Sequence, residues 1–106
     1  MRKAKVYFHG IEAGLLEELL PGKKYKFAYN ADYLGDPISL MMPLSQTIYE
    51  FAAFPPVFEG LLPEGLQLEG MLRRLKIDRD DFFKQLMATG TDLVGAITAE
   101  EVTEDA

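Results

Sequence analysis

The first half of the chain alternates apolar and polar residues over short runs, which is the pattern of half-buried strands. In residues 5–9, Val6 and Phe8 fall on one side and polar or charged side chains fall on the other. Residues 24–29 show the clearest alternation, with their aromatic rings on one face and two lysines and a small residue on the opposite face. These two segments are predicted to be strands of one sheet.

Further segments extend this predicted sheet. After a turn over residues 10–14, the run Leu-Leu-Glu-Glu-Leu-Leu at residues 15–20 predicts a second strand, although the same run also suits a helix. Residues 38–42 predict a fourth strand closed by Pro43, and residues 46–51 are a candidate for another. Because the links between these runs are short, we expect an antiparallel meander.

The stretch Phe-Glu-Gly-Leu-Leu-Pro-Glu-Gly at residues 58–65 marks the change from strands to helices. A helix that starts at residues 55–56, where prolines cost least, should stop at this stretch. Pro63 disfavours helical geometry at Leu62 and donates no backbone hydrogen bond. Gly65 then permits a backbone angle that other residues avoid. We expect a hinge between a sheet half and a helical half.

Helical periodicity follows this hinge. Residues 66–75 carry leucines at helical spacing and predict a second helix. A third helix is predicted next, with Asp78 as its cap, Ile77 packed on Phe82 as a hydrophobic staple, and Gly90 at its end.

The chain closes with another predicted strand and a polar tail. Residues 94–98 are apolar enough for a last strand, and residues 100–106 read as a frayed acidic tail. We therefore expect one domain over residues 1–99. Its fold class is α+β: an antiparallel β-sheet followed by a helical half, with a final strand returning to the sheet.

Composition narrows the class of protein. The 106 residues are 48% hydrophobic, which suits one folded globular domain. The net charge of −6, from 17 acidic and 11 basic residues, argues against direct nucleic-acid binding because the basic residues do not cluster strongly. The N-terminus lacks the apolar core of a signal peptide, and no apolar run approaches the ~20 residues needed to span a bilayer. We expect a soluble cytoplasmic protein.

The sequence offers little catalytic chemistry. His9 is the single histidine and cysteine is absent, so a metal cluster of these residues is excluded. Adjacent carboxylates such as Glu17 and Glu18 point in different directions on a strand or helix and form no acid–base pair. The glycine-containing residues 90–95 follow a helix, whereas a phosphate-binding loop precedes one. We predict a non-enzyme with no cofactor site and no metal site.

Three motifs carry a family resemblance. Residues 37–44, Pro-Ile-Ser-Leu-Met-Met-Pro-Leu, resemble the Pro-Leu-Ser-Leu-Ser-Leu-Pro-Leu segment of HipA-type toxin kinases. Residues 58–65 are similar to their Phe-Phe-x-Asn-Leu-Leu-Pro-Glu/Asp segment, with Gly60 where asparagine is common. Residues 82–97 resemble their Phe-x-Leu-Leu…Gly-Arg-Asp-x-x-Gly-Ala-Val segment, with Thr91 where arginine is common. The three motifs stand in the family order.

The resemblance covers the N-terminal subdomain of that family and not its kinase core. The family includes split HipBST systems, in which a small separate protein, HipS, corresponds to this subdomain. The resemblance therefore implies a non-catalytic antitoxin that binds and restrains a HipT-like Ser/Thr kinase toxin, in a complex that also includes a HipB-like DNA-binding protein. Two alternatives stay open: a subunit that activates or stabilises the kinase, and the N-terminal fragment of a longer HipA-type kinase.

The same resemblance suggests where a partner would bind. We expect contacts at the hinge loop and at the aspartate of the third motif, and the acidic balance of the chain suits a basic groove on the partner. The predicted partner-binding residues are Phe58, Leu62, Pro63, Glu64, Gly65 and Asp92.

Overall fold

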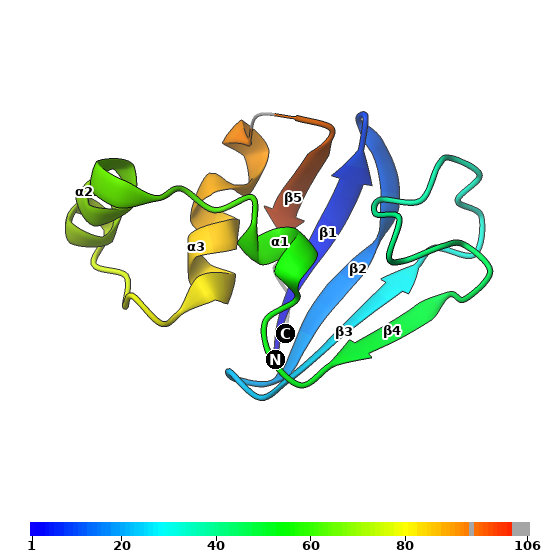
Figure 1. Cartoon of the computed structure of the whole chain (residues 1–106), viewed down its shortest axis with the longest axis horizontal. Coiled ribbons are helices and arrows are strands. Elements are labelled where there is room, and N and C mark those ends of the chain that lie inside the picture. Colours follow the sequence, from blue (N-terminus) through cyan, green and yellow to red (C-terminus); the bar gives the residue numbers. More distant parts are fainter. Residues whose placement is uncertain (94, 103–106) are drawn as a thin grey trace.

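The computed structural model describes residues 1–93 and 95–102. Five antiparallel strands form one sheet in the order β4-β3-β2-β1-β5, and the helices follow β4 in the chain (Figure 1). The elements are β1 (Arg2–Phe8), β2 (Ile11–Leu20), β3 (Lys24–Tyr29), β4 (Ile48–Phe51), α1 (Pro56–Glu59), α2 (Gly65–Leu75), α3 (Phe82–Thr89), the 3-10 turn η1 (Gly90–Asp92) and β5 (Ile97–Glu101). The predicted α+β class with a returning final strand is confirmed.

The first hairpin is tighter than predicted. His9 and Gly10 both have positive φ, 52° and 80°, and Phe8 pairs with Ile11 across the two-residue turn. Positive φ at both central positions is typical of a type I′ turn, whose twist matches that of the flanking strands. The predicted turn over residues 10–14 is therefore wrong. Residues 15–20 form a strand rather than a helix, since β2 pairs with β1 on one side and with β3 on the other.

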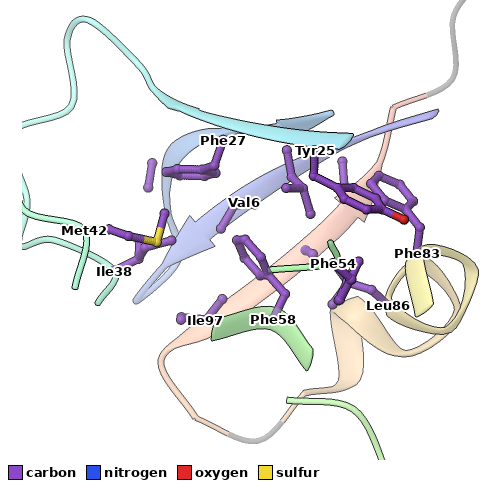
Figure 2. Close-up of a cluster of buried hydrophobic side chains, with 14 of the residues drawn as sticks. Val6, Tyr25, Phe27, Ile38, Met42, Phe54, Phe58, Phe83, Leu86 and Ile97 are labelled. Carbon is purple, nitrogen blue, oxygen red and sulfur yellow. The ribbon is translucent and has the colours of Figure 1, made fainter. Parts of the chain in front are cut away.

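The aromatic face of β3 forms the centre of the core. Phe27 from β3, Phe58 from α1 and Phe83 from α3 are each 0% exposed. Figure 2 shows the Phe58 ring directed toward Phe27 and the Phe83 ring beside Tyr25 of the same strand. Full burial of side chains of this size is worth roughly 1.5–3 kcal/mol each. The alternation predicted for residues 24–29 is therefore present in β3, whose aromatic side chains point toward the helices.

The opposite face of the sheet carries a row of alternating charges. Lys3, Glu17, Lys26 and Glu50 are successive cross-strand partners on β1, β2, β3 and β4. The Glu17 carboxylate lies 3.4 Å from the Lys26 ammonium and 3.9 Å from that of Lys3. Opposite charges facing each other across strands stabilise this register. Glu18 is 4% exposed and pairs elsewhere, which confirms that the two adjacent glutamates diverge.

The predicted strand over residues 38–42 is wrong. These residues lie in the long loop between β3 and β4, where Ile38 and Met42 are 6% and 3% exposed. The Tyr29 hydroxyl accepts a hydrogen bond from the Ile38 backbone N–H at 3.0 Å and donates one to the Met42 carbonyl at 2.6 Å. Because one side chain satisfies both backbone groups, the segment folds as a turn instead of pairing with a strand.

The third helix begins differently from the prediction. Asp81, and not Asp78, is the N-cap of α3, and its carboxylate accepts a hydrogen bond from the Lys84 backbone N–H at 3.1 Å. Ile77 belongs to a small separate cluster with Met71 and Leu72, so the predicted staple onto Phe82 is also wrong.

The last strand lies further along the chain than predicted. Ile97–Glu101 pairs with β1, so Glu100 and Glu101, expected in the tail, continue the strand. Val94 and residues 103–106, which the predictions placed in the strand and the tail, lie outside the described residues.

Gly90 ends α3, but with helical φ of −57° and not with the left-handed angle of a glycine cap. A Cβ on this residue would lie 2.3 Å from the Ala99 carbonyl oxygen. The glycine is therefore required because β5 packs directly against the end of α3.

Candidate functional site

The hinge loop after α1 has the local structure that its proline and glycine predict. The chain leaves α1 through two tight turns, in which the Leu61 N–H bonds to the Phe58 carbonyl and the Leu62 N–H to the Glu59 carbonyl, both at 3.1 Å. Gly65 has φ +60° and opens α2. The helix therefore stops before Pro63, as predicted, and the following residues turn outward toward α2.

A surface groove lies between this hinge loop and the end of α3, and its volume is about 580 Å³. One wall comes from the hinge loop and the start of α2, and the other comes from Thr89 and η1 with the residue after it. We call it the hinge groove, and its lining residues are Gly60, Leu61, Leu62, Pro63, Glu64, Gln67, Thr89, Asp92 and Leu93.

Four of the predicted partner-binding residues meet in the hinge groove. Leu62, Pro63 and Glu64 line one wall, and Asp92 lies on the facing wall although it is distant in sequence. Leu62 is 9% exposed and also packs in the main core. The groove is thus anchored to the core at its base, and its upper parts are open to solvent.

The other two predicted residues have structural roles. Phe58 is 0% exposed and packs on Phe27, with 6.0 Å between ring centroids. The ring is turned into the core, so its side chain does not share the surface formed by the other predicted residues. Gly65 is exposed but is not among the residues that line the groove, and its conformation sets the start of α2.

The electrostatics of the hinge groove are acidic. Glu64 and Asp92 are both exposed, and neither carboxylate has an ion-pair or side-chain hydrogen-bond partner within the described part of the chain. Apolar walls from Leu61, Leu62 and Leu93 lie beside them. This arrangement suits a basic segment of a protein that also carries an apolar side chain.

The described residues contain no group of three or more histidine, cysteine or acidic side chains placed to hold a metal ion. Over the same residues, none of the helices combines the length and the apolar character required to cross a bilayer.

A second polar cluster, which the sequence analysis missed, is built on Arg2. Its guanidinium forms a bidentate pair with Glu18, both bonds at 2.7 Å, and contacts both oxygens of Asp81 at 2.9 and 3.1 Å. It also lies over the Phe83 ring, 5.3 Å from the centroid. The Tyr25 hydroxyl donates to Glu18 at 3.1 Å. The cluster joins β1, β2 and β3 to α3, so its role is to hold α3 on the sheet.

The ionisation of this cluster follows from its contacts. Burial alone would raise the pKa of Asp81, but the hydrogen bonds from Arg2 and from the Lys84 backbone outweigh it and lower the pKa below its usual range. Burial is the main cause that raises the pKa of the Tyr25 hydroxyl. Arg2 was missed because, in sequence, it reads as one of several solvated lysines and arginines before a strand.

Comparison with known proteins gives consistent matches over almost the whole chain. The family model for the HipA N-terminal domain matches residues 4–100. An uncharacterized protein of Haemophilus influenzae is 35% identical over 101 residues, which are 95% of this chain and 93% of that protein. A solved structure of the N-terminal domain of HipA toxin is 31% identical with a TM-score of 0.77, over 99% of this chain and 96% of that one.

Proposed function

The chain belongs to the HipA N-terminal domain family, and from this membership we propose that it is a non-catalytic, HipS-like subunit that binds and restrains a HipT-like Ser/Thr kinase toxin. The family relationship supports a toxin–antitoxin context, since the matched structure is a domain of a toxin. The match is to the N-terminal domain and not to a kinase domain, which is consistent with a non-catalytic role.

The observation that carries the proposal is how much of the Haemophilus influenzae relative this chain covers. The alignment spans 93% of that relative, so that protein consists of little more than this one domain. A split system requires such a domain as a separate polypeptide. In that arrangement the kinase core is a second chain, and the two must meet through a protein–protein interface.

The hinge groove supplies a candidate for that interface. Its free carboxylates, Glu64 and Asp92, would face lysine or arginine side chains of the kinase, and its leucines would cover an apolar residue. Binding there would restrain the kinase by blocking access of substrate or nucleotide, or by holding the kinase lobe in an inactive arrangement. A HipB-like DNA-binding protein would complete the complex.

The test is a phosphorylation assay with a HipT-like kinase from the same organism, with and without this chain. We expect the two proteins to co-purify and the kinase rate to fall when the chain is added. The double charge reversal Glu64→Lys/Asp92→Lys should weaken binding about tenfold or more and restore activity. Asp80→Lys, which alters an exposed acid in the α2–α3 loop, is the control and should bind like the natural chain.

Other outcomes of the same assay separate the alternatives. If the chain binds and the kinase rate rises, it is an activating subunit instead. If the two proteins do not associate, the restraint proposal is wrong. A reading frame that continues from this chain into kinase motifs would assign it to a longer HipA-type kinase, since the matched structure is itself one domain of a HipA toxin.

A further inference from the structure

The loop between β3 and β4, residues 30–47, exposes large apolar side chains. Leu40 is 95% exposed and Met41 is 85% exposed, and Leu34 in the same loop is 95% exposed. Figure 1 shows the loop at the end of the molecule opposite α2 and α3. Neighbouring apolar groups that are exposed on a folded protein are typical of surfaces that bind another protein.

The loop is held in one conformation, so the exposed side chains are part of the folded structure. Ile38 and Met42, on either side of Leu40 and Met41, point into the core beside Phe27 (Figure 2). Three tyrosine hydroxyls bond to the loop backbone: Tyr29 bonds at Ile38 and Met42, Tyr33 bonds to the Asp36 carbonyl at 2.5 Å, and Tyr49 bonds to the Pro43 carbonyl at 2.5 Å. A rigid anchor loses less conformational entropy on binding than a flexible one.

The loop lies in the part of the sequence that carries the net charge, and it contributes two of the acidic residues there, Asp32 and Asp36. Residues 27–72 contain six of the 17 acidic residues and none of the 11 basic ones, so the remaining eleven acids and eleven bases cancel. Asp32 and Asp36 of the loop are exposed and have no ion-pair partner among the described residues. The loop therefore combines rigid apolar anchors with unpaired negative charge.

This charge decides what kind of partner fits. In a symmetric contact of the loop with a second copy of this chain, Asp32 and Asp36 of both copies would meet with no cation between them. A partner with an apolar pocket rimmed by lysine or arginine would instead pair these carboxylates and bury Leu40 and Met41.

We propose that the β3–β4 loop is a second docking element for the kinase, with Leu40 and Met41 as anchors that enter an apolar pocket on its surface. The inference rests on the proposed function, because the kinase is the partner that it names. It adds a contact region separate from the hinge groove, made from the first of the three family motifs.

The experiment measures the affinity of the kinase for the full chain and for two variants by calorimetry. Leu40→Ser/Met41→Ser should weaken binding roughly 10- to 100-fold, as expected when central anchors are removed. Leu20→Ser is the control, since Leu20 is a 54% exposed leucine at the end of β2 and outside the loop. Thermal unfolding of the double variant should stay close to that of the natural chain, because both side chains are exposed.

The outcomes separate this inference from the proposed function. If the natural chain binds and the Leu40/Met41 variant binds equally well, the docking inference is wrong and the proposed function stands. An equal loss of affinity for Leu20→Ser and for the loop variant would also overturn the inference, because the effect would then be general. If the natural chain does not bind the kinase, both fail together.

Discussion

At the scale of single residues, Gly90 determines how closely α3 and β5 approach. A methyl group there would stand 2.3 Å from a backbone oxygen of Ala99, which has little freedom to move within the sheet. We expect Gly90→Ala to lower the free energy of unfolding by about 1–3 kcal/mol, as overpacking against a backbone atom does. Urea unfolding followed by circular dichroism measures the change.

Gly70 provides the matched control for that substitution. It lies inside α2, and a Cβ at this position would have no heavy atom within 4 Å apart from its own neighbours and helix. Gly70→Ala should raise the free energy of unfolding by about 0.5–1 kcal/mol, because alanine favours the helix. If both substitutions shift stability in the same direction, the close approach of β5 to Gly90 is not the controlling factor.

At the scale of elements, the attachment of α3 to the sheet depends on pH. The pKa of Asp81 is lowered in the folded chain from its ordinary value of 3.8, so folding favours the charged carboxylate. Its contribution to stability is fully present above that ordinary value and is lost as the pH falls through the lower folded pKa. Acid should therefore loosen the contact of Arg2 with α3.

The substitution Asp81→Asn tests this pH dependence. Asparagine still caps a helix, so the change removes the ion pair with Arg2 and keeps the bond to the Lys84 amide. We expect a loss of about 1 kcal/mol at neutral pH, since the pair is partly exposed, and a smaller loss as the pH falls below the ordinary value of 3.8 and through the lower folded pKa. Asp78→Asn is the control. If the free energy of unfolding of Asp81→Asn, plotted against pH, runs parallel to that of the natural chain at all pH values, the role given to Asp81 is contradicted.

Elements whose pattern is local were predicted well. The strand over residues 24–29 has the predicted ends, because its alternation alone decides which face is buried. Residues 38–42 also suggest a strand, with apolar side chains at 38, 40 and 42, yet the Tyr29 hydroxyl from another element takes up the backbone groups of Ile38 and Met42. The choice of Asp81 over Asp78 likewise depends on Arg2, which is distant in sequence.

The residues of the candidate site were also predicted only in part from the sequence. Motif order selected Leu62, Pro63, Glu64 and Asp92, and these four meet at the hinge groove. The sequence did not show that Phe58 turns into the core, because a ring at the end of a short helix can face either way. The sequence analysis did not identify Leu40 and Met41 as an exposed pair, because it treated residues 38–42 as a strand. Adjacent side chains of a strand point to opposite faces, so one of the two would then be buried.

At the scale of the whole molecule, the distribution of charge predicts how the chain would associate with the proposed kinase. The net charge of −6 resides in residues 27–72, while the rest of the chain is balanced. Two of the six acids in that segment, Asp32 and Asp36, lie beside the proposed anchors Leu40 and Met41, so we expect a basic surface on the proposed kinase to be attracted to the β3–β4 loop. Such steering acts on the association rate and weakens as salt shortens the Debye length, which is about 8 Å at physiological ionic strength.

Stopped-flow association at several salt concentrations measures this effect. The association rate of the natural chain with the kinase should fall steeply as salt rises, and the dissociation rate should change little. Asp32→Asn/Asp36→Asn should reduce the steepness, because it removes two unpaired charges beside the anchors. Glu100→Gln/Glu101→Gln removes two exposed charges from β5 and should leave the steepness nearly unchanged. If both pairs reduce it equally, the kinase responds to net charge alone, and residues 27–72 do not orient the encounter.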